Sequence, residues 1–235
     1  MRVSHVLELG CGTALPSLLL FSYALRNGLQ MNFSLTDYNA DVLRLVTLPN
    51  MLLVWAGTLT EEDDAQIFTP AEGEAAEGGN TVRACISAAA AAQGDNTEAT
   101  HADLYLTPAV LAAFKSTLAR TGISLTFISG SWLPVSTLLD LIPSAPEMNT
   151  LLLASETIYS PASLAAFVEA MTGLLGRVHV GKALVAAKRV YFGVGGSVDE
   201  FRGECARRGC VAGEVGMEGL EDEGVRRCIC EVQMY

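Results

Sequence analysis

The segment Leu7-Glu-Leu-Gly-Cys-Gly-Thr13 decides how the rest of this chain is interpreted. It joins a short apolar run to a glycine-rich turn, and a helical pattern over residues 14–27 begins directly after it. Gly10 and Gly12 let the backbone approach a ligand where a Cβ atom would clash, and Glu8 places a carboxylate at the end of the strand. The pattern therefore predicts a nucleotide-binding turn between a strand and a helix.

Two familiar glycine-rich turns do not fit this segment. A dinucleotide-binding turn needs a third glycine three residues after Gly12, where a leucine stands, and a phosphate-binding loop needs a following Gly-Lys-Ser/Thr. The end of the next predicted strand, 31–36, supports a nucleoside-binding site of another kind. Asp37 stands there and can accept hydrogen bonds from both hydroxyls of a ribose. Asp37 is the first residue of the segment Asp37-Tyr38-Asn39. The alternative is an aspartate that only caps the following helix.

Strand-like and helix-like patterns alternate along most of the chain, as is typical of a parallel sheet covered on both faces. The last two predicted strands are only about ten residues apart, which permits antiparallel pairing but no helical crossover. We therefore predict one α/β domain over residues 1–235, with a Rossmann-like seven-stranded, mostly parallel sheet, an antiparallel closing hairpin and helices on both faces. The predicted strands are 3–9, 31–36, 124–128, 151–154, 183–187, 211–215 and 226–233, and the predicted helices are 14–27, 39–53, 108–120, 162–175 and 198–208.

Residues 58–100 interrupt this alternation. They contain several acidic residues and an alanine run at 88–92, but few large apolar side chains. Such a composition offers little buried area to offset the entropy lost on ordering. We predict a mostly mobile acidic and alanine-rich insertion, in which a short helix could form within residues 81–92.

The charge of the chain restricts its partners. With 15 Lys and Arg against 26 Asp and Glu, the formal net charge is −11. A nucleic-acid partner is disfavoured, because a phosphate-binding face needs clustered basic residues. A basic protein partner is favoured, since an acidic surface raises its encounter rate. The alternative is that the acidity only aids solubility.

The cysteines and histidines predict no metal site. The six cysteines show no Cys-x-x-Cys pair, and the three histidines are irregularly spaced. With no secretory signal legible, we expect a reducing compartment, the cytoplasm or the nucleus. The apolar run 15–25 is too short to span a bilayer, so no membrane association is predicted.

Several motifs resemble one known family and occur in the same order almost from end to end. The chain resembles the class I S-adenosylmethionine-dependent methyltransferases and, more narrowly, the protein-histidine N-methyltransferases. The first motif is shared by many methyltransferases, whereas the last two are much narrower. The matching motifs are Val6-Leu-Glu-Leu-Gly-Cys-Gly12, Asp37-Tyr-Asn39 with Val42-Leu43, Val46-Thr-Leu-Pro-Asn50, Ser129-Gly-Ser-Trp132, Ser155-Glu-Thr-Ile-Tyr-Ser-Pro161, and Lys188 with Tyr191-Phe-Gly-Val-Gly-Gly196.

The resemblance implies S-adenosyl-L-methionine as the cofactor and S-adenosyl-L-homocysteine as its product. By resemblance, Gly130, Ser131 and Trp132 flank the adenine, and Ser155 lies near the methionine part. The alternative for Trp132 is an ordinary core aromatic. The complete set of cofactor-binding residues implied is Glu8, Gly10, Gly12, Asp37, Tyr38, Asn39, Gly130, Ser131, Trp132 and Ser155.

Glu156 and Tyr159 are the predicted catalytic residues, because their spacing resembles the Asp/Glu-x-x-Tyr motif of protein methyltransferases of this group. Transfer to a histidine needs a neutral imidazole with its lone pair aimed at the methyl carbon. The Glu156 carboxylate could accept a hydrogen bond from the ring nitrogen that does not attack and stabilise the developing positive charge. The alternative is that Glu156 bonds the backbone of a neighbouring loop.

The loop that contains Tyr191, Phe192 and Gly193 belongs to the substrate side by resemblance. Its two aromatic rings could form a wall that stacks on a flat imidazole. The alternative is a glycine-rich connection whose aromatic side chains pack down on the sheet.

The function implied by the resemblance is a protein-L-histidine N-methyltransferase that acts on the tele nitrogen of a histidine in a large-subunit ribosomal protein. Two alternatives remain: a protein-lysine methyltransferase of the same fold, and a catalytically impaired methyltransferase-like partner protein. Family members carry a segment upstream of the first strand that packs across the cofactor, and this sequence lacks it. We therefore expect either a fragment or a more open cofactor site.

Overall fold

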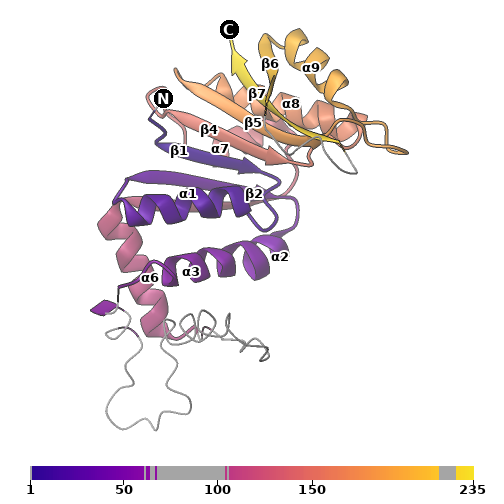
Figure 1. The fold of residues 1–235 in the computed structure, drawn as a ribbon. Helices are drawn as coiled ribbons and strands as arrows, with labels where there is room; N and C mark the ends of the chain where they lie inside the picture. The colour runs from indigo at the N-terminus through magenta and orange to yellow at the C-terminus, as the bar shows by residue number, and fades with distance from the viewer. Residues whose placement is uncertain (1, 61, 64–66, 68–103, 105, 217–225) are drawn as a thin grey trace.

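The structure is a computed structural model that describes residues 2–60, 62–63, 67, 104, 106–216 and 226–235 (Figure 1). One seven-stranded sheet forms its centre, with the strand order β3-β2-β1-β4-β5-β7-β6. The strands are β1 (His5–Leu9), β2 (Met31–Asp37), β3 (Ile123–Ser129), β4 (Thr150–Ser155), β5 (Gly181–Lys188), β6 (Cys210–Val215) and β7 (Arg227–Met234).

Strands β1 to β5 are parallel, whereas β7 runs antiparallel to both β5 and β6. The predicted fold class is thereby confirmed, including the closing hairpin. Helices separate the parallel strands along the chain, as parallel pairing requires. They are α1 (Leu15–Arg26), α2 (Ala40–Val42), the π-helix η1 (Leu43–Thr47), α3 (Leu48–Ala56), α6 (Pro108–Thr121), α7 (Val135–Leu141), α8 (Pro161–Leu175) and α9 (Val198–Arg207).

Two apolar layers hold the helices against the sheet (Figure 1). On one face α1, α3 and α6 pack around Phe33 and Trp55, and on the other α7, α8 and α9 pack around Phe167. Every residue of β1 is buried because both faces of this central strand are covered. The sheet is therefore a rigid platform, and the loops at its carboxyl edge are free to build a site.

The structure differs from the predicted elements at α7, which the sequence pattern did not indicate. This helix is only seven residues long, and its first turn has no side-chain cap. It is held by packing instead, with Leu138 buried and Val135 and Leu139 against the core. The predicted helix within residues 81–92 and most of the predicted insertion at 58–100 lie outside the described residues.

His5 joins three strands inside the sheet. Its Nε2 lies 2.9 Å from the Ser34 hydroxyl on β2, and its Nδ1 lies 3.3 Å from the Thr150 hydroxyl on β4. Burial lowers the pKa of His5 from 6.5 to about 4. The imidazole is therefore neutral at physiological pH and accepts one of these hydrogen bonds while it donates the other.

This lowered pKa predicts a specific loss of stability in mild acid. Between a pH of about 6.5 and 4 the unfolded chain binds a proton at His5 while the folded chain does not, so the stability is present above this window and falls within it. His5 should contribute roughly 1.5–2 kcal/mol to the decrease in unfolding free energy between about pH 7.5 and about pH 5.3. Urea unfolding at the two pH values measures this decrease.

The variant His5→Gln should show a smaller decrease than the wild type, whatever its absolute stability. His179→Gln is the matched control, because His179 is exposed and its replacement should leave the decrease unchanged. Equal pH dependence in the wild type and His5→Gln would contradict the assignment.

Candidate active site

The turn after β1 needs its glycines. Gly10 and Gly12 have φ values of 70° and 51°, in the left-handed region that favours glycine. A Cβ atom on Gly10 would lie 3.3 Å from the Thr157 methyl group and 3.5 Å from the Trp132 ring. The turn is therefore pressed against segments that follow β3 and β4, and the three loops meet at one edge of the sheet.

Asp37 fastens this turn to the end of β2. One carboxylate oxygen accepts a hydrogen bond from the Gly12 amide at 3.0 Å, and the other accepts one from the Asn39 amide at 3.1 Å. The Cys11 amide donates to the Thr36 carbonyl at 2.8 Å. Each oxygen of the Asp37 carboxylate has a further lone pair, so the group can also accept hydrogen bonds from a ligand hydroxyl.

Glu8 is buried inside the sheet and faces the start of α1. Its carboxylate accepts hydrogen bonds from the Ser17 amide at 3.3 Å and from the Ser17 hydroxyl. Burial raises the pKa of Glu8 above its ordinary value. In this structure Glu8 holds the helix against the turn, and a direct contact with a cofactor stays a prediction.

Thr47 is a supporting residue to which the sequence analysis gave no role. It is fully buried at the end of η1, and its hydroxyl donates to the Gly12 carbonyl at 2.7 Å. The wider turn of a π-helix, which often marks a functional site, places the hydroxyl there. Asn50 adds a second link, from its side-chain amide to the Thr13 carbonyl at 3.1 Å. Both residues belong to the motif Val46-Thr-Leu-Pro-Asn50. In the sequence, this family resemblance was the only indication that they support the site.

The segment after β3 lies beside the same turn. The Gly130 amide donates to the Asp37 carbonyl at 3.0 Å, and the Ser131 hydroxyl accepts from the Leu133 amide at 3.0 Å. Trp132 is half-buried and packs edge-on against Phe167, with 5.7 Å between ring centroids. The indole is thus both a core aromatic and a neighbour of the glycine turn.

Glu156 follows β4 in a strained backbone conformation. Its φ is 58°, which is uncommon for a residue with a side chain and is frequent at functional sites. Its carboxylate lies 3.8 Å from the Lys188 ammonium and 3.5 Å from the Arg227 guanidinium. Tyr159, the other predicted catalytic residue, is 49% exposed. The structure thus places the Glu156 carboxylate between two cations at the carboxyl edge, near the end of β5.

The two aromatic residues after β5 differ sharply in exposure. Tyr191 is 7% exposed and packs on the core, whereas Phe192 is 90% exposed. The Tyr191 hydroxyl accepts a hydrogen bond from the Lys188 amide at 3.2 Å, and burial together with the nearby Glu156 raises its pKa to about 12. Tyr191 therefore stays protonated at physiological pH, and Phe192 is by far the more exposed of the two rings.

A backbone contact joins the loops after β4 and β5. The Gly196 amide donates to the Tyr159 carbonyl at 3.2 Å, and the Tyr191 amide donates to the Gly196 carbonyl at 2.9 Å. A Cβ atom on Gly196 would lie 2.0 Å from the Ile158 carbonyl oxygen. Only glycine therefore fits at position 196, where the loop after β4, with the predicted catalytic residues, meets the loop after β5, with the predicted substrate-binding residues.

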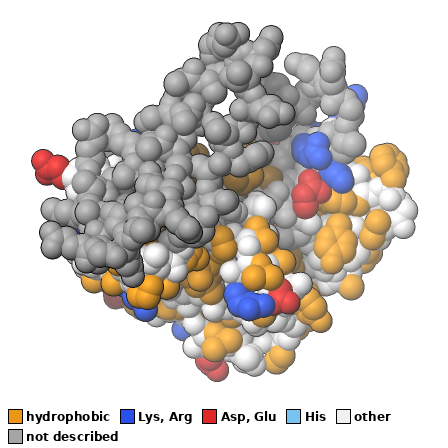
Figure 2. Space-filling model, turned by 90° about the horizontal axis from the view of Figure 1, so that it is seen from below, with side chains coloured by type: hydrophobic (Ala, Val, Ile, Leu, Met, Phe, Trp, Pro, Cys, Tyr) orange, Lys and Arg blue, Asp and Glu red, His pale blue; other side chains and the backbone are white. Residues whose placement is uncertain are grey.

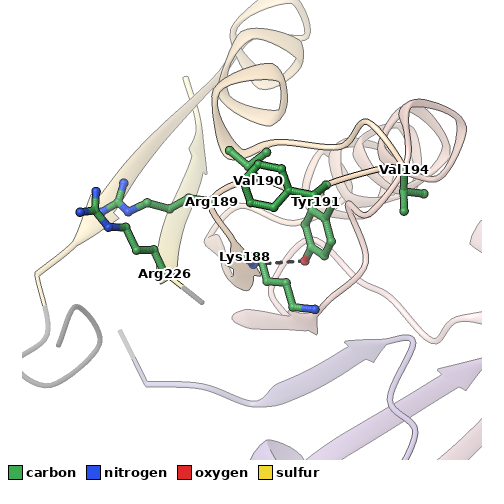
Figure 3. A pocket seen from close by; sticks show the side chains of 7 residues that line it. Lys188, Arg189, Val190, Tyr191, Val194 and Arg226 are labelled. Carbon is green, nitrogen blue, oxygen red and sulfur yellow. Dashed lines mark hydrogen bonds between the residues drawn. The ribbon is translucent and has the colours of Figure 1, made fainter. Parts of the chain in front are cut away.

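A hollow of about 570 Å³ opens beside this loop (Figure 3). Figure 3 shows the Lys188 side chain extending to one side of the hollow and those of Arg189 and Arg226 to the other. The lining residues are Lys188, Arg189, Val190, Tyr191, Phe192, Val194 and Arg226.

Two kinds of structure are absent from the described part of the chain. Among these residues, no group of three His, Cys, Asp or Glu side chains could hold a metal ion. Nor does any described helix have the length and the apolar character needed to cross a membrane.

Two yeast proteins, each named histidine protein methyltransferase 1, align with most of this chain. The Saccharomyces cerevisiae protein is 39% identical over 205 residues, which are 85% of this chain and 48% of that protein. The Schizosaccharomyces pombe protein is 35% identical over 200 residues, again 85% and 48%. The chain is a homologue of the histidine protein methyltransferases. This relationship confirms the predicted resemblance.

The chain spans about half the length of these curated relatives. No protein-family model matches this chain. Among solved structures, a methyltransferase from Pyrococcus furiosus is similar, with a TM-score of 0.48 and 8% identity, covering 98% of this chain and 75% of that one.

The contact at Gly196 predicts that Gly196→Ala destabilises the protein by roughly 1–3 kcal/mol, the usual cost of overpacking. The new methyl group would force apart the loops after β4 and β5, because it meets a backbone carbonyl rather than a flexible side chain. Chemical denaturation measures the loss. Gly213→Ala is the control, since no described atom beyond the two neighbouring residues lies within 4 Å of a Cβ built at that position. Two variants of equal stability would contradict the described loop contact.

Proposed function

We propose that this chain is the catalytic domain of an S-adenosylmethionine-dependent protein-L-histidine N-methyltransferase. The observation that carries the proposal is the 39% identity to a protein named histidine protein methyltransferase 1. The geometry supports it, because the glycine turn, Asp37 and Glu156 lie at the carboxyl edge of the sheet, where ligands of open α/β sheets bind.

The residues at this edge suit the proposed cofactor. Asp37 has lone pairs left for two ribose hydroxyls, and the turn at Gly10 and Gly12 leaves its backbone accessible. The buried Thr157 hydroxyl has no hydrogen-bond partner among the described residues, and the methyl group of the same side chain lies beside the turn. A buried hydroxyl without a partner is costly, and a polar ligand at the turn would supply one. Asp37, the turn and Thr157 would therefore hold the ligand.

Glu156 is the residue we assign to the target imidazole. S-adenosylmethionine supplies an electrophilic methyl group and leaves as S-adenosylhomocysteine. The tele nitrogen of the substrate histidine must present its lone pair, so the other ring nitrogen must carry the proton. The Glu156 carboxylate accepts a hydrogen bond from that nitrogen and stabilises the imidazolium charge. Lys188 and Arg227 hold the carboxylate in place from two sides.

The proposed substrate is a large-subunit ribosomal protein in the cytoplasm or nucleus. Its support is indirect: the chain carries a net charge of −11, and such a surface accelerates encounters with basic proteins. A lysine substrate would require removal of a proton from an ammonium group before transfer. The identity of the methylated residue therefore separates the histidine and lysine alternatives.

Calorimetric titration with S-adenosylhomocysteine tests the cofactor site. We expect micromolar binding by the wild type and a loss of about tenfold or more in Asp37→Ala, because two charge-assisted hydrogen bonds and the ribose acceptors disappear. Asp41→Ala is the matched control, since Asp41 is exposed and, among the described residues, forms an ion pair only with Arg44 on the helical turn that follows. Absence of binding by the folded wild type, or equal affinity in Asp37→Ala, would contradict the proposal.

Methyl transfer to purified large-subunit ribosomal proteins tests the reaction, with the modified residue located by mass spectrometry. Glu156→Gln should lower the transfer rate roughly ten- to a hundredfold, because the charge that stabilises the imidazolium is lost. Its affinity for S-adenosylhomocysteine should stay that of the wild type. Glu169→Gln, on α8, is the control and should leave the rate unchanged. Methyllysine as the product, or an unchanged rate in Glu156→Gln, would reject the assigned chemistry.

A further inference from the structure

The ammonium group of Lys188 lies between an aromatic ring and a carboxylate at the end of β5. Its Nζ atom is 5.6 Å from the centroid of the Tyr191 ring and 3.8 Å from a carboxylate oxygen of Glu156. A cation over an aromatic face at this distance is attracted by the electrons of the ring, and the carboxylate adds an attraction between opposite charges. The two groups together form a site for an alkylammonium ion, and the chain fills it with its own Lys188.

Backbone hydrogen bonds hold this arrangement in place. The Lys188 amide donates to the Tyr191 hydroxyl at 3.2 Å, and the Tyr191 amide donates to the Gly196 carbonyl at 2.9 Å. Figure 3 shows the Lys188 side chain on the opposite side of the hollow from Arg189 and Arg226. The Tyr191 side chain is buried, so its ring offers a fixed face to the ammonium group.

An ion pair alone would not distinguish Lys188 from other basic residues. Figure 2 shows charged side chains in small groups of both signs on the face seen from below, with hydrophobic side chains between them. At the other end of β5, the Lys182 ammonium pairs with Glu231 at 2.8 Å, but no described aromatic ring lies beneath it. The Lys188 ammonium differs because it has both a ring and the carboxylate that we assign to the target imidazole.

A substrate lysine would bind through the same two groups. Its ammonium is attracted by a carboxylate and by an aromatic face, whereas a neutral imidazole needs only an acceptor for its N–H group. With Lys188 in place, a second ammonium beside Glu156 meets a like charge, which opposes its binding. The imidazole meets no such repulsion, and the Glu156 carboxylate has further lone pairs to offer it.

We propose that Lys188 is a specificity-determining residue, whose ammonium occupies the place that a substrate ammonium would take and thereby reserves Glu156 for a neutral imidazole. This inference rests on the proposed histidine methyltransferase function. It assigns Tyr191 to the support of Lys188, in agreement with the burial of its side chain. Arg227, whose guanidinium lies 3.5 Å from the Glu156 carboxylate, adds a second like charge against an incoming ammonium.

Thermal unfolding in n-butylammonium chloride, whose cation resembles a lysine side chain, tests whether Lys188 fills an ammonium site. Lys188→Ala empties the place over the ring, so about 100 mM n-butylammonium should raise its melting temperature by about 2–4 °C relative to the same concentration of sodium chloride. The wild type and Lys188→Met should show no such rise, because their side chains still cover the Tyr191 ring. Lys182→Ala, on the same strand, is the matched control and should show none either.

An equal rise in the wild type and Lys188→Ala, or no rise in either, would overturn the proposal. An equal rise in Lys188→Met and Lys188→Ala would overturn it too, since n-butylammonium would then bind elsewhere. Lys188→Ser is a second variant that empties the same place if Lys188→Ala does not fold.

Methyl transfer to purified large-subunit ribosomal proteins tests the selectivity at about pH 9, where a few per cent of lysine side chains are neutral. A lysine that has released its proton to solvent attacks the methyl carbon, and S-adenosylhomocysteine leaves. Lys188→Ala should raise the ratio of methyllysine to methylhistidine about tenfold or more over the wild type, because one like charge is lost. Lys182→Ala should keep the wild-type ratio. An unchanged ratio in Lys188→Ala would overturn the proposal, even if this variant binds n-butylammonium.

These measurements separate the inference from the proposed function. Wild-type protein that binds S-adenosylhomocysteine and methylates histidine, with neither change in Lys188→Ala, would overturn only the role of Lys188. Wild-type protein that neither binds S-adenosylhomocysteine nor methylates histidine would overturn the function and the selectivity with it. The n-butylammonium measurement needs no cofactor, so it would still show whether Lys188 fills an ammonium site. Lys188→Ala should bind S-adenosylhomocysteine with wild-type affinity, which shows that the variant is folded.

Discussion

The hydrogen bond from the Gly12 amide to the Asp37 carboxylate joins the ends of β1 and β2, and the site is built around it. The other Asp37 oxygen holds the start of the next helix, and the Asp37 carbonyl accepts the Gly130 amide from the segment after β3. Three strand ends are thereby fixed at one residue. Thr47 reinforces the corner from the helical side, so a ligand at the turn meets a preorganised backbone rather than a loop that must order on binding.

Most of the fold could be predicted from the sequence because its signals are local. A buried central strand, a glycine turn and a helix follow one another within the first 27 residues, and alternating patterns imply a parallel sheet. The role of Gly196 could not be predicted, because it depends on the Ile158 carbonyl, which a different segment supplies. The same holds for α7, whose stability comes from packing against the core rather than from its own caps.

Adjacent residues after β5 show why sequence alone could not settle the substrate side. Tyr191 and Phe192 are neighbouring aromatics, and a pattern of two rings does not say which one is buried. In the structure the Tyr191 hydroxyl bonds the Lys188 amide and its ring packs on the core, while Phe192 stays exposed. The alternative of an aromatic side chain packed on the core thus describes Tyr191, and contact of Phe192 with a substrate stays a prediction. The course of the loop after β5 decides which ring is buried, and the hydrogen bond from the Gly196 amide to the Tyr159 carbonyl helps to fix this course.

Net charge and local charge answer different questions about partners. The net charge of −11 acts over distances near the Debye length and would therefore affect how fast the proposed basic substrate is encountered. The charges around Glu156 act only at contact, where the Lys188 ammonium and the Arg227 guanidinium lie 3.8 and 3.5 Å from its carboxylate. Under the proposed function, the net charge would attract basic proteins in general, whereas the groups around Glu156 would decide which side chain is accepted at the site. Position at the site, rather than overall charge, would then select the target residue.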